Sequence, residues 1–131
     1  MVPKSLVPAF LGFALGVAAT APAAAQQVDF LGSRMVADLS ETDVIQADGA
    51  ERYTAVRLCV AQRAVHFRDF DVFFANGGHQ DSIVRLEIPA GDCTRWIDLR
   101  GGARNIDRIV MRYDTLVNMG VQAQVSAYGR R

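Results

Sequence analysis

The sequence predicts an all-β fold, a single antiparallel β-sandwich of about eight strands after an N-terminal signal peptide. Apolar and polar residues alternate with a period of two along most of the chain beyond the leader. Gly, Pro, Asn and Asp residues interrupt these runs roughly every 8 to 12 residues, which is typical of sandwiches. Sustained helical spacing is absent beyond the leader. A closed β-barrel is the alternative arrangement of the same strands.

Residues 1–25 have the pattern of a secretory signal peptide. Lys4 gives a short positive region, Leu6 to Ala19 forms an uncharged apolar core, and Ala23-Ala24-Ala25 supplies small residues for cleavage. An uncleaved membrane anchor is the alternative, although Pro8 and Pro22 favour cleavage. We therefore expect a periplasmic or secreted bacterial protein whose residues 26–131 form one domain, with no membrane span after cleavage.

The strands expected in chain order are Phe30 to Val36, a short one at Val44-Ile45, and the segments 53–61, 64–74, 82–88, 93–99, 106–114 and 121–128. Half-buried alternation favours antiparallel pairing with one solvated face per sheet. Within 64–74 the apolar positions change phase, because Phe67 and Phe70 fall on opposite faces. This slip predicts a β-bulge near Arg68-Asp69.

The charge balance excludes some partners. Residues 26–131 carry 13 arginines, no lysine and 14 acidic residues, so their net charge is −1. A near-neutral domain has no overall field that would attract nucleic acid or an anionic membrane. Neither is expected as a partner.

Cys59 and Cys93 are the only cysteines, and both follow the predicted leader. In an oxidising compartment two thiols in a small domain usually form a disulfide. Two separate buried thiols are the alternative. The chain has no C-x-x-C spacing, so a thioredoxin-like redox role has no support.

The segment RGGARN, residues 100–105, places a glycine pair between arginines. A phosphate-binding glycine loop leads into a helix N-terminus, but here a strand-like run follows. The spacings of nucleotide-binding loops are also absent. We therefore expect Gly101 and Gly102 to form a turn or bulge that requires a left-handed or Cβ-free backbone position.

Arginines gather around this turn, at Arg100, Arg104 and Arg108. Such a set could bind an anionic sugar or a carboxylate-bearing peptide. The alternative is a solvated sheet face on which Asp98 and Asp107 balance the arginines.

Two further residues complete the candidate surface. Phe73 points away from the face that carries Phe74, so it is expected to be exposed unless another layer covers it. His79 lies with Asp81 on a glycine-rich loop, but two ligands are too few for a closed metal site. No metal or cofactor is expected. No serine lies in a nucleophile elbow, and Asp69 and Asp71 are interpreted as surface ion-pair partners.

Four segments, LGSRMVADLSETDVI, YTAVRLCV, VHFRDFDVFFANG and TRWIDLRGGARNIDRIVMRY, resemble a family of small secreted bacterial proteins known as a domain of unknown function. The most specific motif is I-D-L-x-G-G-x-R-x-I, at residues 97–106. The resemblance covers residues 31 to 129 and implies a periplasmic β-sandwich, with no catalytic residues to transfer.

The expected function is therefore a non-catalytic binding or interaction module for a cell-envelope glycan or protein. Its candidate surface consists of Arg100, Arg104, Arg108, Phe73 and His79. A small periplasmic hydrolase on the same scaffold is the alternative.

Overall fold

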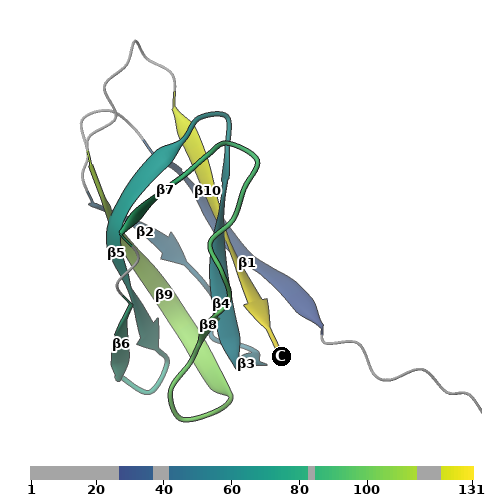
Figure 1. Cartoon of the computed structure of the whole chain (residues 1–131). Coiled ribbons are helices and arrows are strands. Elements are labelled where there is room, and N and C mark those ends of the chain that lie inside the picture. Colours follow the sequence, from purple (N-terminus) through teal and green to yellow (C-terminus); the bar gives the residue numbers. More distant parts are fainter. Residues whose placement is uncertain (1–26, 37–41, 83–84, 115–121) are drawn as a thin grey trace, which may run out of the picture.

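The computed structural model describes residues 27–36, 42–82, 85–114 and 122–131. The predicted signal peptide lies outside these residues, as do Ile83, Val84 and Val121 of two predicted strands. In the described residues the chain is all-β, as predicted, and forms two antiparallel sheets (Figure 1). Among these residues the two sheets are separate and do not close into a barrel, so the structure agrees with the predicted sandwich and not with the barrel alternative.

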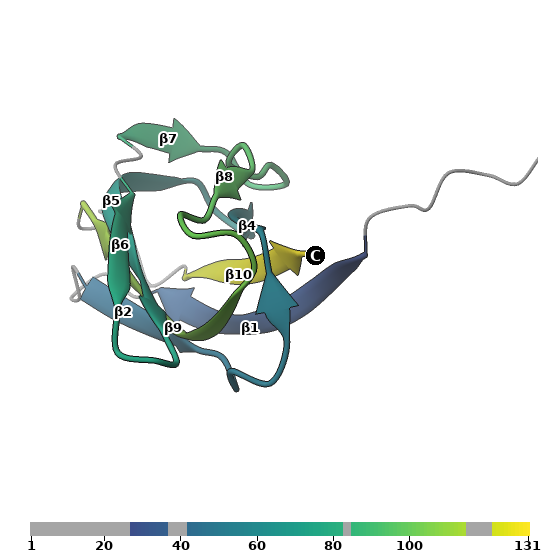
Figure 2. The same cartoon turned by 90° about the horizontal axis from the view of Figure 1, so that it is seen from below.

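The smaller sheet has the strand order β1-β10-β4-β8. These strands span Val28–Val36, Ala123–Arg130, Ala55–Ala61 and Ile97–Asp98. The larger sheet has the order β2-β9-β5-β6, and β3 and β7 pair with β9 and β5 respectively. Its strands are Thr42–Gln46, Arg104–Tyr113, Val65–Phe74 and His79–Ser82, with β3 at Arg52–Tyr53 and β7 at Leu86–Ile88. Figure 2 shows the layers from below.

β10 is one of the two inner strands of the smaller sheet, and it pairs with β1 on one side and β4 on the other. Its residues alternate between buried and half-buried. Leu58 and Val60 of β4 point into the core together with Val125 and Ala127 of β10. The period-two pattern therefore buries one face of this sheet, as the sequence predicts.

The larger sheet is built on β5 and β9, which have ten residues each. Their register shifts between Phe67 and Asp69, which confirms the predicted bulge near Arg68-Asp69. Because the bulge restores the phase, Phe67 and Phe70 both lie in the core with no exposed surface.

Three predicted strands are divided or shortened in the structure. The segment 53–61 changes sheets at Thr54: Tyr53 pairs with β9, whereas Ala55 pairs with β10 and β8. The segment 82–88 is shared between the end of β6 and β7. Only Ile97–Asp98 of 93–99 forms a strand, because the hydroxyl of Thr94 accepts the hydrogen bond of the Leu58 amide in place of a ladder carbonyl.

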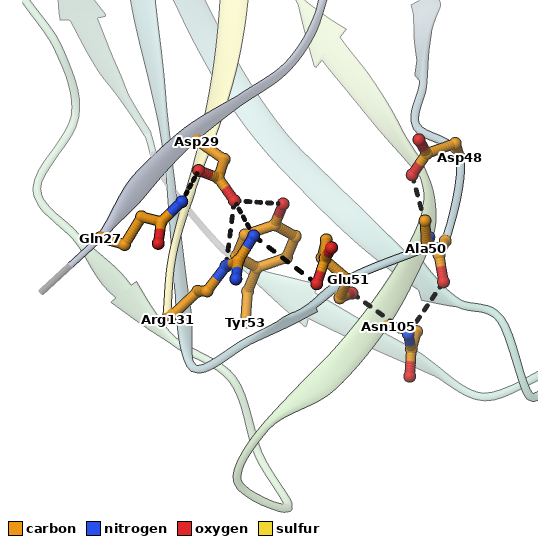
Figure 3. Close-up of polar contacts among 9 residues, drawn as sticks. Gln27, Asp29, Asp48, Ala50, Glu51, Tyr53, Asn105 and Arg131 are labelled. Atoms are coloured by element: carbon orange, nitrogen blue, oxygen red, sulfur yellow. Dashed lines mark hydrogen bonds and ion pairs between the residues drawn. The ribbon is translucent and has the colours of Figure 1, made fainter.

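A polar cluster at one end of the fold holds the C-terminus. Nε and Nη2 of Arg131 donate to Asp29 at 3.1 and 2.8 Å, and the hydroxyl of Tyr53 donates to the same carboxylate at 3.0 Å (Figure 3). The hydrogen bonds from Arg131 and Gln27 lower the pKa of Asp29. Burial raises the pKa of Tyr53 to about 12, and its bond to Asp29 acts in the same direction. This cluster joins β1, β3 and the last residue of the chain.

Within the described ranges, no helix is long and apolar enough to cross a membrane.

Candidate functional site

The structure contains the predicted disulfide between Cys59 and Cys93, whose Cα atoms are 3.9 Å apart. Cys59 lies on the outer side of β4, and Cys93 pairs with it in an isolated bridge. The amide of Thr94 donates to the carbonyl of Leu58 at 2.8 Å, immediately beyond this link. The disulfide therefore fixes the segment that leads into β8 against the edge of the smaller sheet.

The glycine pair lies in the turn between β8 and β9. Gly101 has a φ of 91° and Gly102 a φ of 84°. Both lie in the left-handed region, which residues with a side chain rarely adopt. The turn thus has the backbone geometry that the sequence predicts, and it leads directly into a strand.

Beside this turn lies a hollow of about 530 Å³. Its lining comes from the turn itself, the start of β9, the end of β5 and β3: Arg52, Phe74, Ala75, Asn76, Gly101, Ala103, Arg104 and Asn105. The lining contains two arginines and no acid. The hollow is therefore a positively charged concavity at one end of the larger sheet.

Both guanidinium groups of the hollow are held in place. Arg104 donates through Nη1 to the carbonyl of Arg100 at 2.8 Å, and its Cζ lies 3.7 Å from the centre of the Phe74 ring. Arg52 donates through Nη2 to the carbonyl of Ala103 at 3.0 Å. Neither arginine has a carboxylate within 4.0 Å in the described part of the chain. Their positive charges thus remain available to an anion.

Gln80 positions this turn, and the sequence analysis did not identify it. Its Nε2 donates to the carbonyl of Asp98 at 3.0 Å, and its Oε1 accepts from the amide of Arg100 at 2.8 Å. Gln80 is 6% exposed, although its neighbours in the run HQD are polar and exposed. Gln80 occupies a position that the alternation of the strand places on the buried face, and a polar residue at such a position is the sequence signal that could have identified it.

Three of the predicted surface residues lie together elsewhere. Phe73 on β5 is paired with Arg108 on β9 and with His79 on β6. The Arg108 Cζ lies 4.1 Å from the centre of the Phe73 ring, and the His79 ring stacks on it at 5.3 Å with an interplanar angle of 20°. Phe73 is therefore half-buried and not exposed as expected, because the side chains of its two neighbours in the same sheet cover its ring.

The candidate surface is consequently divided. Arg104 lines the hollow and Arg100 supplies its carbonyl to Arg104, but the Arg100 side chain is exposed and outside the lining. Arg108, Phe73 and His79 form their own stack on the outer face of the larger sheet. The five predicted surface residues therefore do not form one continuous surface: some lie at the hollow, and the others form the stack around Phe73.

A second hollow of about 380 Å³ lies over the bulge of β5. Its lining consists of His66, Phe67, Arg68, Asp69, Arg85, Arg112 and Asp114. Nδ1 of His66 lies 2.6 Å from Oδ2 of Asp114, and both side chains are about half exposed. This geometry orients the imidazole, as a carboxylate orients a catalytic histidine.

Asp69 and Asp71 form ion pairs with Arg112 at 3.4 and 3.0 Å, in agreement with their interpretation from the sequence. Asp81 lies opposite Asp71, and its hydrogen bond with that residue raises the pKa of Asp81. Oxygen atoms of the three carboxylates lie within 4.8 Å of one another. Arg112 neutralises part of the charge of this group.

Neither curated proteins nor solved structures yield a significant match to the chain. A family model described as a domain of unknown function, DUF2541, matches residues 8–129. The match confirms the family resemblance inferred from the sequence and extends over nearly the whole chain. The protein is a member of the DUF2541 family of domains of unknown function.

Proposed function

We propose that the protein is a non-catalytic binding module of the bacterial cell envelope, and that its ligand is an anionic glycan. The observation that carries this proposal is the hollow of about 530 Å³ beside the glycine turn, whose lining includes Arg52 and Arg104 and no acid. An arginine fork matches a carboxylate or sulfate group of a sugar chain geometrically.

The two arginines are already oriented before any ligand binds. Backbone carbonyls fix one nitrogen of each guanidinium, and the Phe74 ring supports Arg104. A preorganised site loses less conformational entropy when it binds. Asn76 and Asn105 also line the hollow, and each side chain is partly engaged: Asn76 Oδ1 accepts from the Gly78 amide, and Asn105 Nδ2 donates to the carbonyls of Gly49 and Glu51. Nδ2 of Asn76 and Oδ1 of Asn105 are the amide atoms that suit sugar hydroxyls.

Export is consistent with the disulfide, because such bonds persist in oxidising compartments. The proposed location is the periplasm or the exterior of the cell, where envelope glycans are found.

The test uses protein purified after expression of the full chain. Tetragalacturonic acid serves as the anionic probe and its methyl ester as the neutral twin, with binding measured by calorimetry. We expect saturable binding of the acid and at least about tenfold weaker binding of the ester, because a hydrogen bond to a charged group contributes about 1.5–3 kcal/mol. Arg52→Gln is expected to weaken binding of the acid by a similar factor.

Arg68→Gln is the matched control, because it removes the same charge from an exposed position lining the other hollow. Equal binding of acid and ester, or equal loss in the Arg52 and Arg68 variants, would contradict the proposed site. Absence of any saturable binding would contradict an anionic-glycan function.

A small hydrolase is the second candidate function, and the His66–Asp114 pair favours it. The described lining of that hollow offers no hydroxyl or thiol nucleophile, so the chemistry would be activation of water by His66 as a general base. Hydrolysis of p-nitrophenyl acetate that is lost in His66→Ala and reduced in Asp114→Asn would support the enzyme. A rate indistinguishable between wild type and both variants would exclude this centre.

A further inference from the structure

The outer face of the smaller sheet carries a row of large side chains that the envelope-glycan proposal does not use. Phe30 on β1 is paired with Tyr128 on β10, and Tyr128 is paired with Arg57 on β4. Tyr128 and Arg57 point away from the core, because their chain neighbours on β10 and β4 are buried. Phe30 is 60% exposed and its ring packs against that of Tyr128. Trp96, which immediately precedes β8, completes the row beside Arg57.

Trp96 holds two guanidinium groups. The Cζ atoms of Arg57 and Arg130 lie 4.5 and 4.8 Å from its ring centre. The Nε–H groups of both arginines are buried and have no acceptor among the described residues. A carboxylate is the group that pairs best with a guanidinium fork.

These two charges lack firm partners within the described chain. Arg57 has no carboxylate within 4.0 Å, and the one near Arg130 is Asp98 at 3.8 Å, whose side chain is 90% exposed. The face therefore presents a positive centre that is complementary to an external acid.

The disulfide fixes this centre. Cys93 is joined to Cys59 on the outer side of β4, and Thr94 hydrogen-bonds to the backbone of Leu58. Trp96 follows only three residues after Cys93. Its position over Arg57 is thus set before a partner arrives, which lowers the entropy lost on binding.

Apolar surface continues from this centre onto β1, an edge strand. Phe30 is 60% exposed and Val28 is 45% exposed, and Val28 is paired with Arg130. A mixture of aromatic side chains, arginine and exposed aliphatic groups is the composition of protein interfaces and of their hot spots. The rings of Phe30 and Tyr128 meet at 65°, so they do not form the flat platform on which a sugar chain stacks.

We propose that the outer face of the smaller sheet docks a partner protein through a segment that carries a carboxylate among apolar side chains. The carboxylate pairs with Arg57 at Trp96, and the apolar side chains contact Phe30 and Val28. This surface lies on the opposite sheet from the proposed glycan site and does not depend on it.

Trp96 is the only tryptophan, so its fluorescence reports directly on this surface. The probe is a short synthetic peptide in which Asp and Glu alternate with Ile and Phe, and its twin has Asn and Gln in their place. Full-chain protein is titrated with each peptide. We expect a saturable change in emission with the acidic peptide and at least about tenfold weaker binding of the twin.

Arg57→Gln and Phe30→Ser are each expected to weaken binding of the acidic peptide about tenfold, whereas the exposed control Arg68→Gln leaves it unchanged. Arg57→Lys, which keeps the charge but not the fork, serves as a second variant, and thermal melting verifies that each protein folds. Equal affinity for the two peptides, full affinity in Arg57→Gln, or no saturable change overturns the proposal. Tighter binding of polygalacturonate than of the peptide at Trp96 also overturns it, in favour of a glycan surface.

Discussion

Replacement of Gly129 by alanine tests how closely β10 of the smaller sheet packs against Tyr53, which pairs with β9 of the larger sheet. A Cβ added at Gly129 would lie 2.6, 2.7 and 3.0 Å from Cδ1, Cγ and Cε1 of Tyr53. Carbon atoms in contact are normally about 3.5–4.0 Å apart, so the ring or the strand would have to move by roughly 1 Å.

Neither can move freely. Gly129 is paired with Asp29 on one side and Val56 on the other, so the backbone of β10 is held from both edges. The Tyr53 ring is held at its far end by the hydrogen bond to Asp29 at 3.0 Å. Overpacking of this kind costs about 1–3 kcal/mol. A loss of about 2 kcal/mol in the free energy of unfolding lowers the Tm of a domain of this size by roughly 10 °C.

The assay is urea unfolding followed by the fluorescence of Trp96, together with thermal melting by circular dichroism. Ser126→Ala, on the outer side of the same strand, is the control. In a Tyr53→Ala background the contact is absent, so Gly129→Ala is expected to cost little. An equal loss of stability in both backgrounds would refute the steric explanation.

Three further outcomes are expected. Cys59→Ser/Cys93→Ser should lower the free energy of unfolding by about 4 kcal/mol, because the bond closes a loop of 34 residues in the unfolded chain; unchanged urea midpoints would contradict this. Gln80→Leu should cost about 1–3 kcal/mol and speed hydrogen exchange in the glycine turn, because the Asp98 carbonyl and the Arg100 amide, which are part-buried, lose their hydrogen-bond partners; unaltered exchange would show that the turn does not need the amide. The pKa of Asp29 is lowered in the folded state, so its stabilisation is present above its ordinary pKa of about 3.9 and is lost as the pH falls through the lowered value. Arg131→Ala should therefore lose less stability on acidification than wild type, and parallel pH profiles would argue against this link.

Local patterns in the sequence were sufficient to predict much of the fold. Alternation identified the strands around β4, β5, β9 and β10, and the phase slip identified the bulge at Arg68-Asp69. These features follow from the pleat, whose period is read directly along the chain. The change of sheet at Thr54 was not predicted, because pairing partners distant in sequence decide it.

The candidate site was predicted less completely. The glycine turn and Arg104 were identified, but the role of Gln80 depends on strand β6 lying beside the turn. Arg52 was not considered because it is remote in sequence from Arg104. The contact of Trp96 with Arg57 and Arg130 was not predicted, because it depends on the sheet order β10-β4-β8.

Residue types and local spacing were enough to predict the all-β class, the positions of the main strands, the positive φ angles at Gly101 and Gly102, and the family. These properties depend on residue type and on spacing between near neighbours. The three-dimensional arrangement of the strands was needed to show which arginines gather in a hollow without acids and which lie against Trp96. Such groupings depend on strand register and sheet order, which bring together side chains far apart in the chain and determine which charges find a partner.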